Sequence, residues 1–358
     1  MICVFIRSLT KGGSEKQSII LTSVLKKKYS TILVVLHGDY IDEEYSKIIA
    51  EENINFVRLK GSLIKKLSEL YRVFRSNRVD LIFCYLLSDN IWGAIIGKIA
   101  GIKNIIGGVR SSSMPIWKML LMNSVHHLIQ NYTVFNNKAG RDIFVSRYHF
   151  NPRKAIVIYN CYLNVPQRVI RTENEVVKIL TVGRFVGLKD LDTSLESINT
   201  LRAINNSGVR FKFLIVGYGE LENHIRELTE KLKLKDIVEI IIKPEKISDY
   251  YEESDIYLST SIYEGLSNSI MEAMAYCLPV VATNVGDNHF LIKDGVNGFL
   301  TDTVDANMIS EKLLQLVESG NLRNKMGANS YEHLIKDFSS DHFSENYYSL
   351  IESLKAGA

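Results

Sequence analysis

The sequence has few of the features that mark several large classes of proteins. Its cysteines are only four, lie far apart and form no Cys-x-x-Cys pair: Cys3, Cys84, Cys161 and Cys277. This spacing argues against a disulfide framework and a cysteine-bound metal, and it favours a reducing cytosol. Only 5 of the 358 residues are proline, and the 46% hydrophobic and 23% charged content excludes a disordered or collagen-like chain. At about 150 residues per domain, the length predicts two domains.

Long uninterrupted apolar runs are also missing. Met1 to Ile6 runs directly into Arg7, so we expect no secretory leader. Charged residues interrupt the stretch from Val79 to Val109, and Asn, Gln and His interrupt the uncharged stretch from Met119 to Asn137. Because a membrane-spanning helix needs about 20 mainly apolar residues, we expect any membrane contact to be peripheral.

The chain as a whole lacks a strong charge of either sign, since its formal net charge is only +3. The two halves differ, however. Residues 1–160 hold 23 basic and 11 acidic side chains, a net charge of +12, whereas residues 161–358 hold 20 and 29, a net charge of −9. Such asymmetry predicts that the first half meets an anionic partner, which could be a lipid surface, a phosphorylated substrate or nucleic acid.

The densest basic run extends from Ser62 to Arg78, where five Lys and Arg residues alternate with apolar residues at helical spacing. A basic amphipathic helix of this kind can lie on an anionic membrane. A surface helix with a solvated cationic face would have the same pattern, and both interpretations stay open. The run lacks the interleaved aromatic residues that stack on bases, so we expect no nucleic-acid partner.

Short β-branched runs alternate with helical stretches along the whole chain, which predicts two α/β domains of Rossmann type with parallel sheets. A segment without periodicity, Val165 to Asn174, predicts the linker between them. Strands are expected at residues 2–6, 31–36, 80–85, 104–107, 155–159, 177–182, 211–216, 238–242, 256–259 and 279–283. Ligands in such folds bind at the carboxyl ends of strands, so the loops that follow the strands are the candidate sites.

Two of these loops are rich in glycine. Gly12-Gly13-Ser14-Glu15 follows the first strand, where backbone N–H groups at a helix start can approach an anion, although a simple tight turn explains the same glycines. Neither this loop nor Gly217-Tyr218-Gly219 completes the G-x-G-x-x-G pattern, which disfavours a nucleotide-dependent oxidoreductase.

A third loop, residues 183–190, contains Arg184 and Lys189 beside glycines at the end of a strand. Two cations so placed can neutralise a diphosphate, or they can pair with surface carboxylates. Asp190 and Asp192 could hold a divalent cation, but Asp190 opens a predicted helix and we interpret it as the N-cap. We therefore expect no metal.

The most informative segment spans residues 261–275. A helix is expected to begin near Ser267, so that the N–H groups at its start, those of Leu266, Ser267, Asn268 and Ser269, can bind an anion. Glu264 precedes this helix and Glu272 lies within it among apolar residues. The two carboxylates can bind hydroxyl groups in one site, or they can be a capping residue and a surface charge.

Glu264 and Glu272 match the E-x7-E signature of the family-4 retaining glycosyltransferases, which have the GT-B fold. The similar pattern continues through Leu278 to Thr283, Val285-Gly286 and Asp294 to Phe299, and it is densest from 177 to 300. The resemblance implies two Rossmann-like domains that face a central cleft. These would be an acceptor-binding domain at 1–165, with a final helix at about 342–358 packed back on it, and a nucleotide-sugar-binding domain at 166–341.

The resemblance also implies roles for the donor-site residues. Arg184 and Lys189 would hold the donor diphosphate with the help of the helix start at Leu266 to Ser269, and Glu272 would bind the ribose. Glu264 would contact the hydroxyls of the transferred sugar.

Other implied contacts concern the base and the first domain. Gly13 would bring its backbone against the donor, and the base would lie near Gly217 and Lys243. Lys243 stands where the family often has glycine, and Phe290 stands where it usually has a carboxylate.

The expected activity is transfer of a sugar, with retention, from a nucleoside-diphosphate sugar to a hydroxyl group, without cofactor or metal. UDP is inferred from its frequency in the family. The acceptor would be a glycan or a polyprenyl-diphosphate-linked glycan, with Glu15 and Arg110 as candidate acceptor contacts. The protein would be cytoplasmic and peripheral at the inner face of the cell membrane, held there by its basic half. A soluble acceptor, and a nucleotide-sugar-binding protein without turnover, remain the alternatives.

Overall fold

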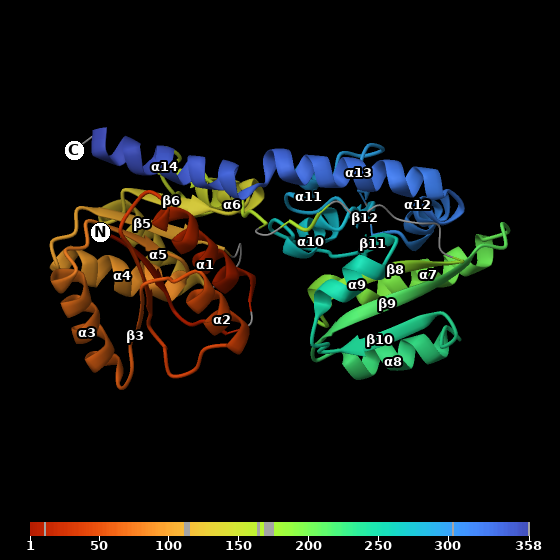
Figure 1. The fold of residues 1–358 in the computed structure, drawn as a ribbon, viewed down its shortest axis with the longest axis horizontal. Helices are drawn as coiled ribbons and strands as arrows, with labels where there is room; N and C mark the ends of the chain where they lie inside the picture. Colours follow the sequence, from red (N-terminus) through yellow and green to blue (C-terminus); the bar gives the residue numbers. More distant parts are fainter. Residues whose placement is uncertain (11, 111–114, 163–164, 168–174, 303, 357–358) are drawn as a thin grey trace. The chain divides into compact units, whose positions relative to one another are not determined.

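The computed structural model describes the chain except for residues 11, 111–114, 163–164, 168–174, 303 and 357–358. The chain forms two compact units (Figure 1). Unit 1 comprises Met1–Leu163 and Ser340–Ala358, and unit 2 comprises Asn164–Ser339. Most of the expected linker, Val165 to Asn174, and Ser111 beside Arg110 lie outside the described residues.

Unit 1 contains a sheet of seven parallel strands in the order β3-β2-β1-β4-β5-β6-β7. The strands are β1 (Ile2–Ile6), β2 (Thr31–Val35), β3 (Phe56–Arg58), β4 (Leu81–Cys84), β5 (Asn104–Val109), β6 (Tyr132–Phe135) and β7 (Ala155–Val157). The helices are α1 (Gly13–Lys26), α2 (Glu43–Glu51), α3 (Leu63–Ser76), α4 (Leu87–Ile99), α5 (Ile116–Leu128), α6 (Lys138–Tyr148) and α14 (Ser340–Ala356).

Alternate side chains of β1 enter two separate hydrophobic clusters, one on each face of the sheet. Val4 packs with residues of α1, α2 and α14, whereas Phe5 packs with residues of α3, α4 and α5. The central strands β1, β2 and β4 are buried on both faces, which is why they are continuous apolar runs in the sequence.

Unit 2 contains six parallel strands in the order β10-β9-β8-β11-β12-β13. They are β8 (Val176–Arg184), β9 (Arg210–Tyr218), β10 (Val238–Ile242), β11 (Ile256–Ser259), β12 (Val280–Thr283) and β13 (Gly298–Thr301). The helices are α7 (Leu191–Ile204), α8 (Glu222–Lys231), α9 (Ile247–Glu253), α10 (Asn268–Ala275), α11 (Asn288–Leu291), α12 (Ala306–Glu318) and α13 (Gly320–Asp337), with a short 3₁₀ turn at Gly187–Lys189.

The last helix, α14, belongs to unit 1 although the whole of unit 2 precedes it in the chain (Figure 1). Tyr347 and Ile351 are buried in the core with α1 residues. The Tyr348 Oη donates to the Val24 carbonyl at 2.7 Å, and Lys28 pairs with Glu352 at 2.6 Å.

The predicted fold class, two parallel α/β sheets, is confirmed. Three strands were not predicted. β3 has only three residues and an exposed end, β6 adjoins a long uncharged segment without alternation, and β13 opens with glycine. Short strands with such weak patterns become recognisable only through their neighbours in the sheet. In the part of the chain that the structure describes, no helix combines the length and the apolar character needed to cross a membrane.

Candidate active site

The candidate site lies at the carboxyl edge of the sheet of unit 2. In the parallel register, Gly183 is paired with Gly217 and Arg184 with Tyr218, while Ile242 of β10 is also paired with Gly217. The loops after β8, β9 and β10 therefore start side by side, as is expected of a ligand-binding edge.

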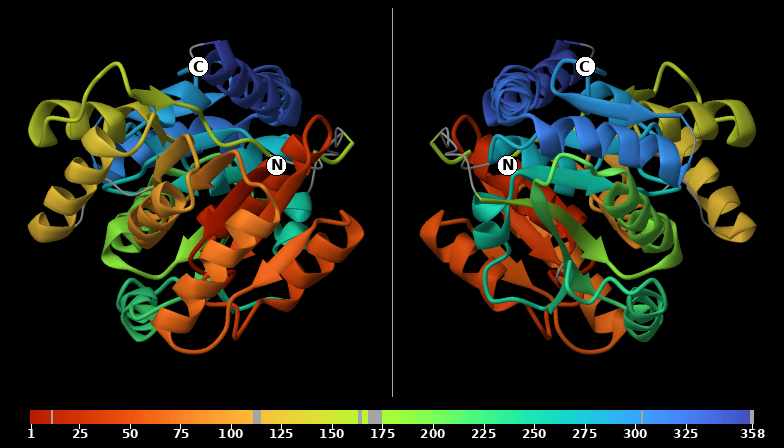
Figure 2. Two further views of the ribbon diagram at one scale, coloured as in Figure 1. Left: turned by 90° about the vertical axis from the view of Figure 1, so that its left-hand side faces the viewer. Right: turned by 90° about the vertical axis from the view of Figure 1, so that its right-hand side faces the viewer.

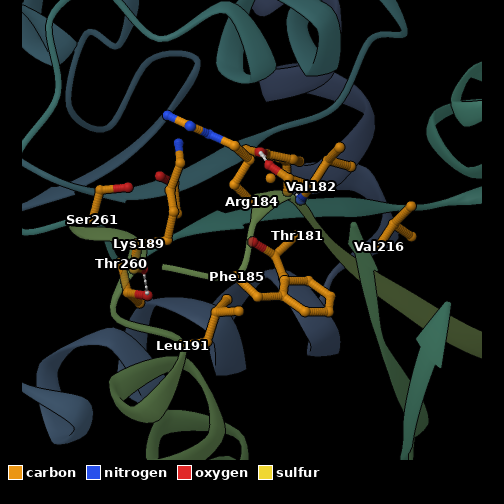
Figure 3. Close-up of a pocket in the computed structure, with 12 residues that line it drawn as sticks. Thr181, Val182, Arg184, Phe185, Lys189, Leu191, Val216, Thr260 and Ser261 are labelled. Atoms are coloured by element: carbon orange, nitrogen blue, oxygen red, sulfur yellow. Dashed lines mark hydrogen bonds between the residues drawn. The ribbon is translucent and has the colours of Figure 1, made fainter. Parts of the chain in front are cut away.

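A pocket at this edge contains Arg184 and Lys189 together (Figure 3). Its other lining residues come from β8, β9, α7 and the end of β11: Thr181, Val182, Gly183, Phe185, Leu191, Val216, Tyr257, Ser259, Thr260 and Ser261. Figure 3 shows the basic ends of Arg184 and Lys189 on the same side of this pocket. Arg184 is exposed, and its side chain has no ion-pair or hydrogen-bond partner among the described residues.

Lys189 pairs with Glu264, which lies 75 residues further along the chain. The distance between Lys189 Nζ and Glu264 Oε1 is 2.5 Å, and Ser261 Oγ donates to the same carboxylate oxygen at 2.8 Å. The backbone joins the two loops as well, because Ile262 N donates to the Leu188 carbonyl at 3.0 Å. Two residues that the sequence analysis singled out in separate motifs thus form one charged pair at the edge of the pocket.

Glycines allow the backbones around this pair to approach each other closely. A Cβ on Gly217 would collide with the carbonyl oxygen of Gly183, and a Cβ on Gly286 would collide with that of Glu264. Gly286 also has a φ of +56°, a conformation that favours glycine. The next residue, Asp287, donates its N–H to the Gly265 carbonyl at 3.1 Å. The loop after β12 therefore supports the backbone that carries Glu264.

Glu272 accepts a hydrogen bond from a tyrosine that the sequence analysis did not identify. Helix α10 begins at Asn268 after Ser267, close to the predicted start, and Glu272 lies in its second turn. Tyr251 Oη of α9 donates to Glu272 Oε2 at 3.0 Å. The Tyr251 ring is buried and stacks between those of Tyr257 and Tyr276. No motif marks Tyr251, because only the packing of α9 against α10 brings its hydroxyl to the carboxylate.

Lys243, the residue expected near the base, adopts a left-handed backbone conformation with a φ of +45°. Its N–H donates to the Gly217 carbonyl at 3.2 Å, and its Nζ lies 5.3 Å from the centre of the Tyr218 ring. The resemblance predicted that glycine is usual at this position, and the conformation provides a physical reason for that preference.

The two aspartates after Lys189 have separate partners. Asp190 is the N-cap of α7, as predicted, and its carboxylate accepts hydrogen bonds from the N–H and the hydroxyl of Thr193 at 3.4 and 2.8 Å. Asp192 pairs with His224 at 2.8 Å. Within the described residues, no group of three or more His, Cys, Asp and Glu side chains is arranged to hold a metal ion.

The glycine-rich loop of unit 1 is fixed by Tyr45. Gly12 N donates to Tyr45 Oη at 3.2 Å, and Tyr45 Oη donates to the Gly12 carbonyl at 2.7 Å. Gly13 is the first residue of α1 and Glu15 lies in its first turn. These two predicted residues therefore lie at the carboxyl end of β1, in unit 1.

Arg110 follows β5 and is surrounded by uncharged groups. Its guanidinium carbon lies 4.5 Å from the centre of the Tyr85 ring. Nη1 and Nη2 make long hydrogen bonds, both 3.4 Å, to Asn160 Oδ1 and Tyr347 Oη. Its Nε is buried and has no partner among the described residues. A buried cation without a carboxylate partner is costly, so the environment of Arg110 is suited to an anion.

His126 of α5 has a structural role. It is buried, its Nδ1 lies 2.7 Å from Thr133 Oγ1, and its Nε2 accepts the Asn151 N–H at 3.0 Å. Burial lowers the pKa of His126 to about 4, so the imidazole is neutral at physiological pH.

We predict that Lys243→Gly stabilises the protein, because glycine removes the clash of Cβ in the left-handed conformation. The gain should be up to about 1 kcal/mol and should raise the midpoint of thermal unfolding. The matched control is Lys212→Gly, at an exposed position inside strand β9, where glycine should only destabilise. Equal destabilisation by both substitutions would contradict the prediction.

Comparison with known proteins shows a resemblance between this chain and glycosyltransferases. Residues 167–333, which lie in unit 2, match the family Glycosyl transferases group 1. The chain is 22% identical to the GalNAc-α-(1→4)-GalNAc-α-(1→3)-diNAcBac-PP-undecaprenol α-1,4-N-acetyl-D-galactosaminyltransferase of Campylobacter jejuni, over 99% of each sequence. It is 26% identical to an uncharacterized glycosyltransferase of Methanocaldococcus jannaschii, over 84% of this chain and 83% of that protein.

Solved structures share the fold of this chain along its full length. HepE of Anabaena, determined in complex with UDP and glucose, superposes with a TM-score of 0.82 at 18% identity, over 99% of this chain and 100% of that chain. A glycosyltransferase of Rickettsia africae superposes with a TM-score of 0.82 at 17% identity, over 100% and 99%. The chain thus has the fold of GT-B glycosyltransferases, and its second unit matches the model of the Glycosyl transferases group 1 family.

Proposed function

We propose that this protein is a retaining, metal-independent glycosyltransferase that uses a nucleoside-diphosphate sugar, specifically a UDP-sugar, as donor. The observation that carries the proposal is the single pocket edge formed by Arg184 and the Lys189–Glu264 pair. It combines two cations for a diphosphate with a carboxylate for sugar hydroxyls. Arg184, Lys189 and Glu264 are the catalytic residues under this proposal.

The reaction needs stabilisation of the negative charge that develops on the leaving diphosphate. As the bond between the anomeric carbon and the phosphate oxygen breaks, Arg184, Lys189 and the N–H groups at the start of α10 would stabilise that charge. The acceptor hydroxyl would attack from the face that the diphosphate leaves, and its proton would pass to the departing phosphate oxygen. Attack on that face retains the anomeric configuration.

Glu264 would have two tasks in this reaction. Its carboxylate orients Lys189 directly, and its remaining hydrogen-bonding capacity can accept from the hydroxyls of the transferred sugar. Ser261 holds the same carboxylate in place. A positioned ion pair of this kind can orient the cation before the diphosphate charge develops.

The rest of the donor would be recognised along the same edge. Glu272, held by Tyr251, would accept hydrogen bonds from the two ribose hydroxyls, and the base would lie by Gly217 and Lys243. A uridine donor is supported by the likeness to HepE, whose structure holds UDP. Gly13 would contribute backbone contacts from unit 1.

We propose a lipid-diphosphate-linked glycan as the acceptor, in the assembly of O-antigen, capsule or another bacterial surface polysaccharide. The names of two relatives support this, since the Campylobacter jejuni enzyme and an Escherichia coli α-1,3-galactosyltransferase both act on diphosphoundecaprenol-linked sugars. Arg110 would bind a phosphate of such an acceptor because its buried guanidinium has only uncharged partners among the described residues. Glu15 would contact acceptor hydroxyls.

The cellular location follows from this acceptor. A protein that uses a cytosolic nucleotide sugar and a membrane lipid would be cytoplasmic and peripheral at the inner face of the membrane, where its basic first half meets anionic lipid. A soluble acceptor is the alternative within the same reaction class. A donor-binding protein without turnover is the alternative outside it.

Replacing Lys189 or Glu272 by alanine should test the donor site. We expect Lys189→Ala to lower kcat for sugar transfer by about 10²- to 10³-fold, as loss of a charge-stabilising group does. Glu272→Ala should mainly raise KM for the donor. Lys178→Ala is the matched control, because Lys178 forms a similar 2.5 Å ion pair with Glu253 at the other end of β8. Near-normal turnover in both site variants would refute the assignment, and donor binding without any transfer would favour the binding protein.

Tyr251→Phe should separate positioning from catalysis. Loss of one hydrogen bond to a carboxylate is worth about 1.5 to 3 kcal/mol, so KM for the donor should rise about tenfold or more while kcat changes little. Tyr250→Phe, a substitution of the preceding residue of α9, is the control. A fall in kcat at unchanged KM would contradict the role assigned to Tyr251.

Arg110→Gln should weaken binding of the acceptor and leave binding of the donor unchanged. We expect KM for a polyprenyl-diphosphate-linked acceptor to rise about tenfold or more, with unchanged slow hydrolysis of the donor. Arg147→Gln, an exposed arginine of α6, is the control. If the KM values for the acceptor agree in both variants, Arg110 has no role in acceptor binding.

A further inference from the structure

Helix α3, the basic amphipathic helix of the sequence analysis, uses its apolar side to pack on the sheet. Leu70 and Phe74 of α3 are fully buried in the cluster that contains Phe5 of β1. Part of the amphipathic pattern of this helix is therefore explained by the core of unit 1. Lys66 is also buried, whereas Leu63 (44% exposed), Ile64 (83%) and Tyr71 (39%) remain at the surface with the other basic residues of α3.

Helix α5 differs because it is apolar on both sides. One side, which includes Met119, Met122 and Val125, is buried against the sheet. The opposite side is exposed and carries large apolar side chains, here called the α5 strip: Ile116 (65% exposed), Trp117 (62%), Leu120 (63%), Leu121 (39%) and Leu128 (80%). At a rise of about 1.5 Å per residue, the strip extends about 18 Å along the helix, with the exposed Ser124 and His127 between Leu121 and Leu128. Large apolar side chains gathered on an exposed surface mark an interaction site.

The charge around the α5 strip indicates the partner. Between Asp89 and Asp142 the chain has no acidic residue and has six basic ones: Lys98, Lys103, Arg110, Lys118, Lys138 and Arg141. Lys118 lies on α5 itself, with its Nζ 5.2 Å from the centre of the Trp117 ring. Helix α4, which packs against α5, ends with Lys98 and the exposed Ile99. An apolar strip on a helix within a basic stretch of the chain is suited to an anionic bilayer, whereas a second copy would bring two basic segments together.

The place of α5 in the fold connects it to the proposed acceptor site. Arg110 is the first residue after β5, and α5 begins six residues later at Ile116. The start of the α5 strip and the proposed phosphate contact therefore belong to the same edge of the sheet of unit 1. Tryptophan at this start is the residue type that prefers the boundary between acyl chains and headgroups.

We infer that α5 is the membrane-docking element of this protein, lying flat in the interface of an anionic bilayer with the α5 strip among the acyl chains. This inference rests on the proposed function for the lipid acceptor, but it assigns the contact to α5 rather than to α3. Docking through α5 places Arg110 at the level of the lipid headgroups, where the diphosphate of a lipid-linked acceptor lies.

Binding to vesicles tests the inference directly. Phosphatidylcholine vesicles with phosphatidylglycerol should bind the full-length protein in a sedimentation assay, and pure phosphatidylcholine vesicles should bind it less. The variant Trp117→Ser/Leu120→Ser/Leu128→Ser should lose at least about tenfold in apparent affinity. The control is Tyr40→Ser/Met308→Ser/Ile335→Ser, which removes exposed apolar side chains elsewhere and should bind like the parent. Equal binding of the two triple variants would overturn the inference.

Fluorescence provides a second measurement at α5 itself. The chain has two tryptophans, Trp92 and Trp117, so the variant Trp92→Phe reports on Trp117 alone. Its emission should shift to shorter wavelength when vesicles containing phosphatidylglycerol are added, and an unchanged spectrum would contradict insertion. Should the parent instead form a dimer that the α5 triple variant abolishes, without binding vesicles, the α5 strip is a contact between copies and the inference fails.

Activity separates this inference from the proposed function. With a short-chain, water-soluble diphosphate acceptor, the α5 triple variant should transfer sugar like the parent, whereas with the acceptor embedded in vesicles its rate should fall. A parent without transfer to either acceptor would contradict the proposed function while the vesicle results still decide the role of α5. An equal rate of the variant and the parent on embedded acceptor would count against docking through α5.

Discussion

The pair formed by Lys189 and Glu264 is the interaction on which the arrangement of the candidate site depends. It joins the loop after β8 to the loop before α10, and three further groups hold it: the Ser261 hydroxyl, the Leu188 carbonyl and the tight turn at Gly286. Each partner also neutralises the other, so neither is an isolated charge at a partly buried edge. The two loops that form the site are therefore held together by a charged pair that belongs to the site itself.

Much of the fold could be predicted because its signals are local. Buried parallel strands are apolar runs, and Asp190 directly before a helical stretch has the chemistry of a cap. The ion pair between Lys189 and Glu264 could not be predicted, because the two residues are 75 positions apart in the sequence. Only the arrangement of the strands in the sheet brings their loops together. Tyr251 was missed for the same reason: its role depends on how two helices pack, and a tyrosine in a short helix carries no distinctive pattern.

The comparison of α3 and α5 shows why amphipathic patterns need the structure for their interpretation. In α3 the periodic pattern of apolar residues accounts for the burial of Leu70 and Phe74 on the sheet, while Leu63, Ile64 and Tyr71 stay exposed. In α5 large apolar residues occur on two opposite sides of the helix, and a helix of that kind buries both sides only if it has a partner on each. The core of unit 1 covers only one of them.

The return of α14 to unit 1 affects how the protein can fold during its synthesis. Lys28, which follows α1, and its partner Glu352 in α14 are separated by 324 residues, and the core that contains Tyr347 is incomplete until α14 has been synthesised. Unit 2 is continuous in sequence, so its segments need not wait for a distant part of the chain. The core of unit 1, whose strands are synthesised before unit 2, is therefore completed after unit 2 has been synthesised.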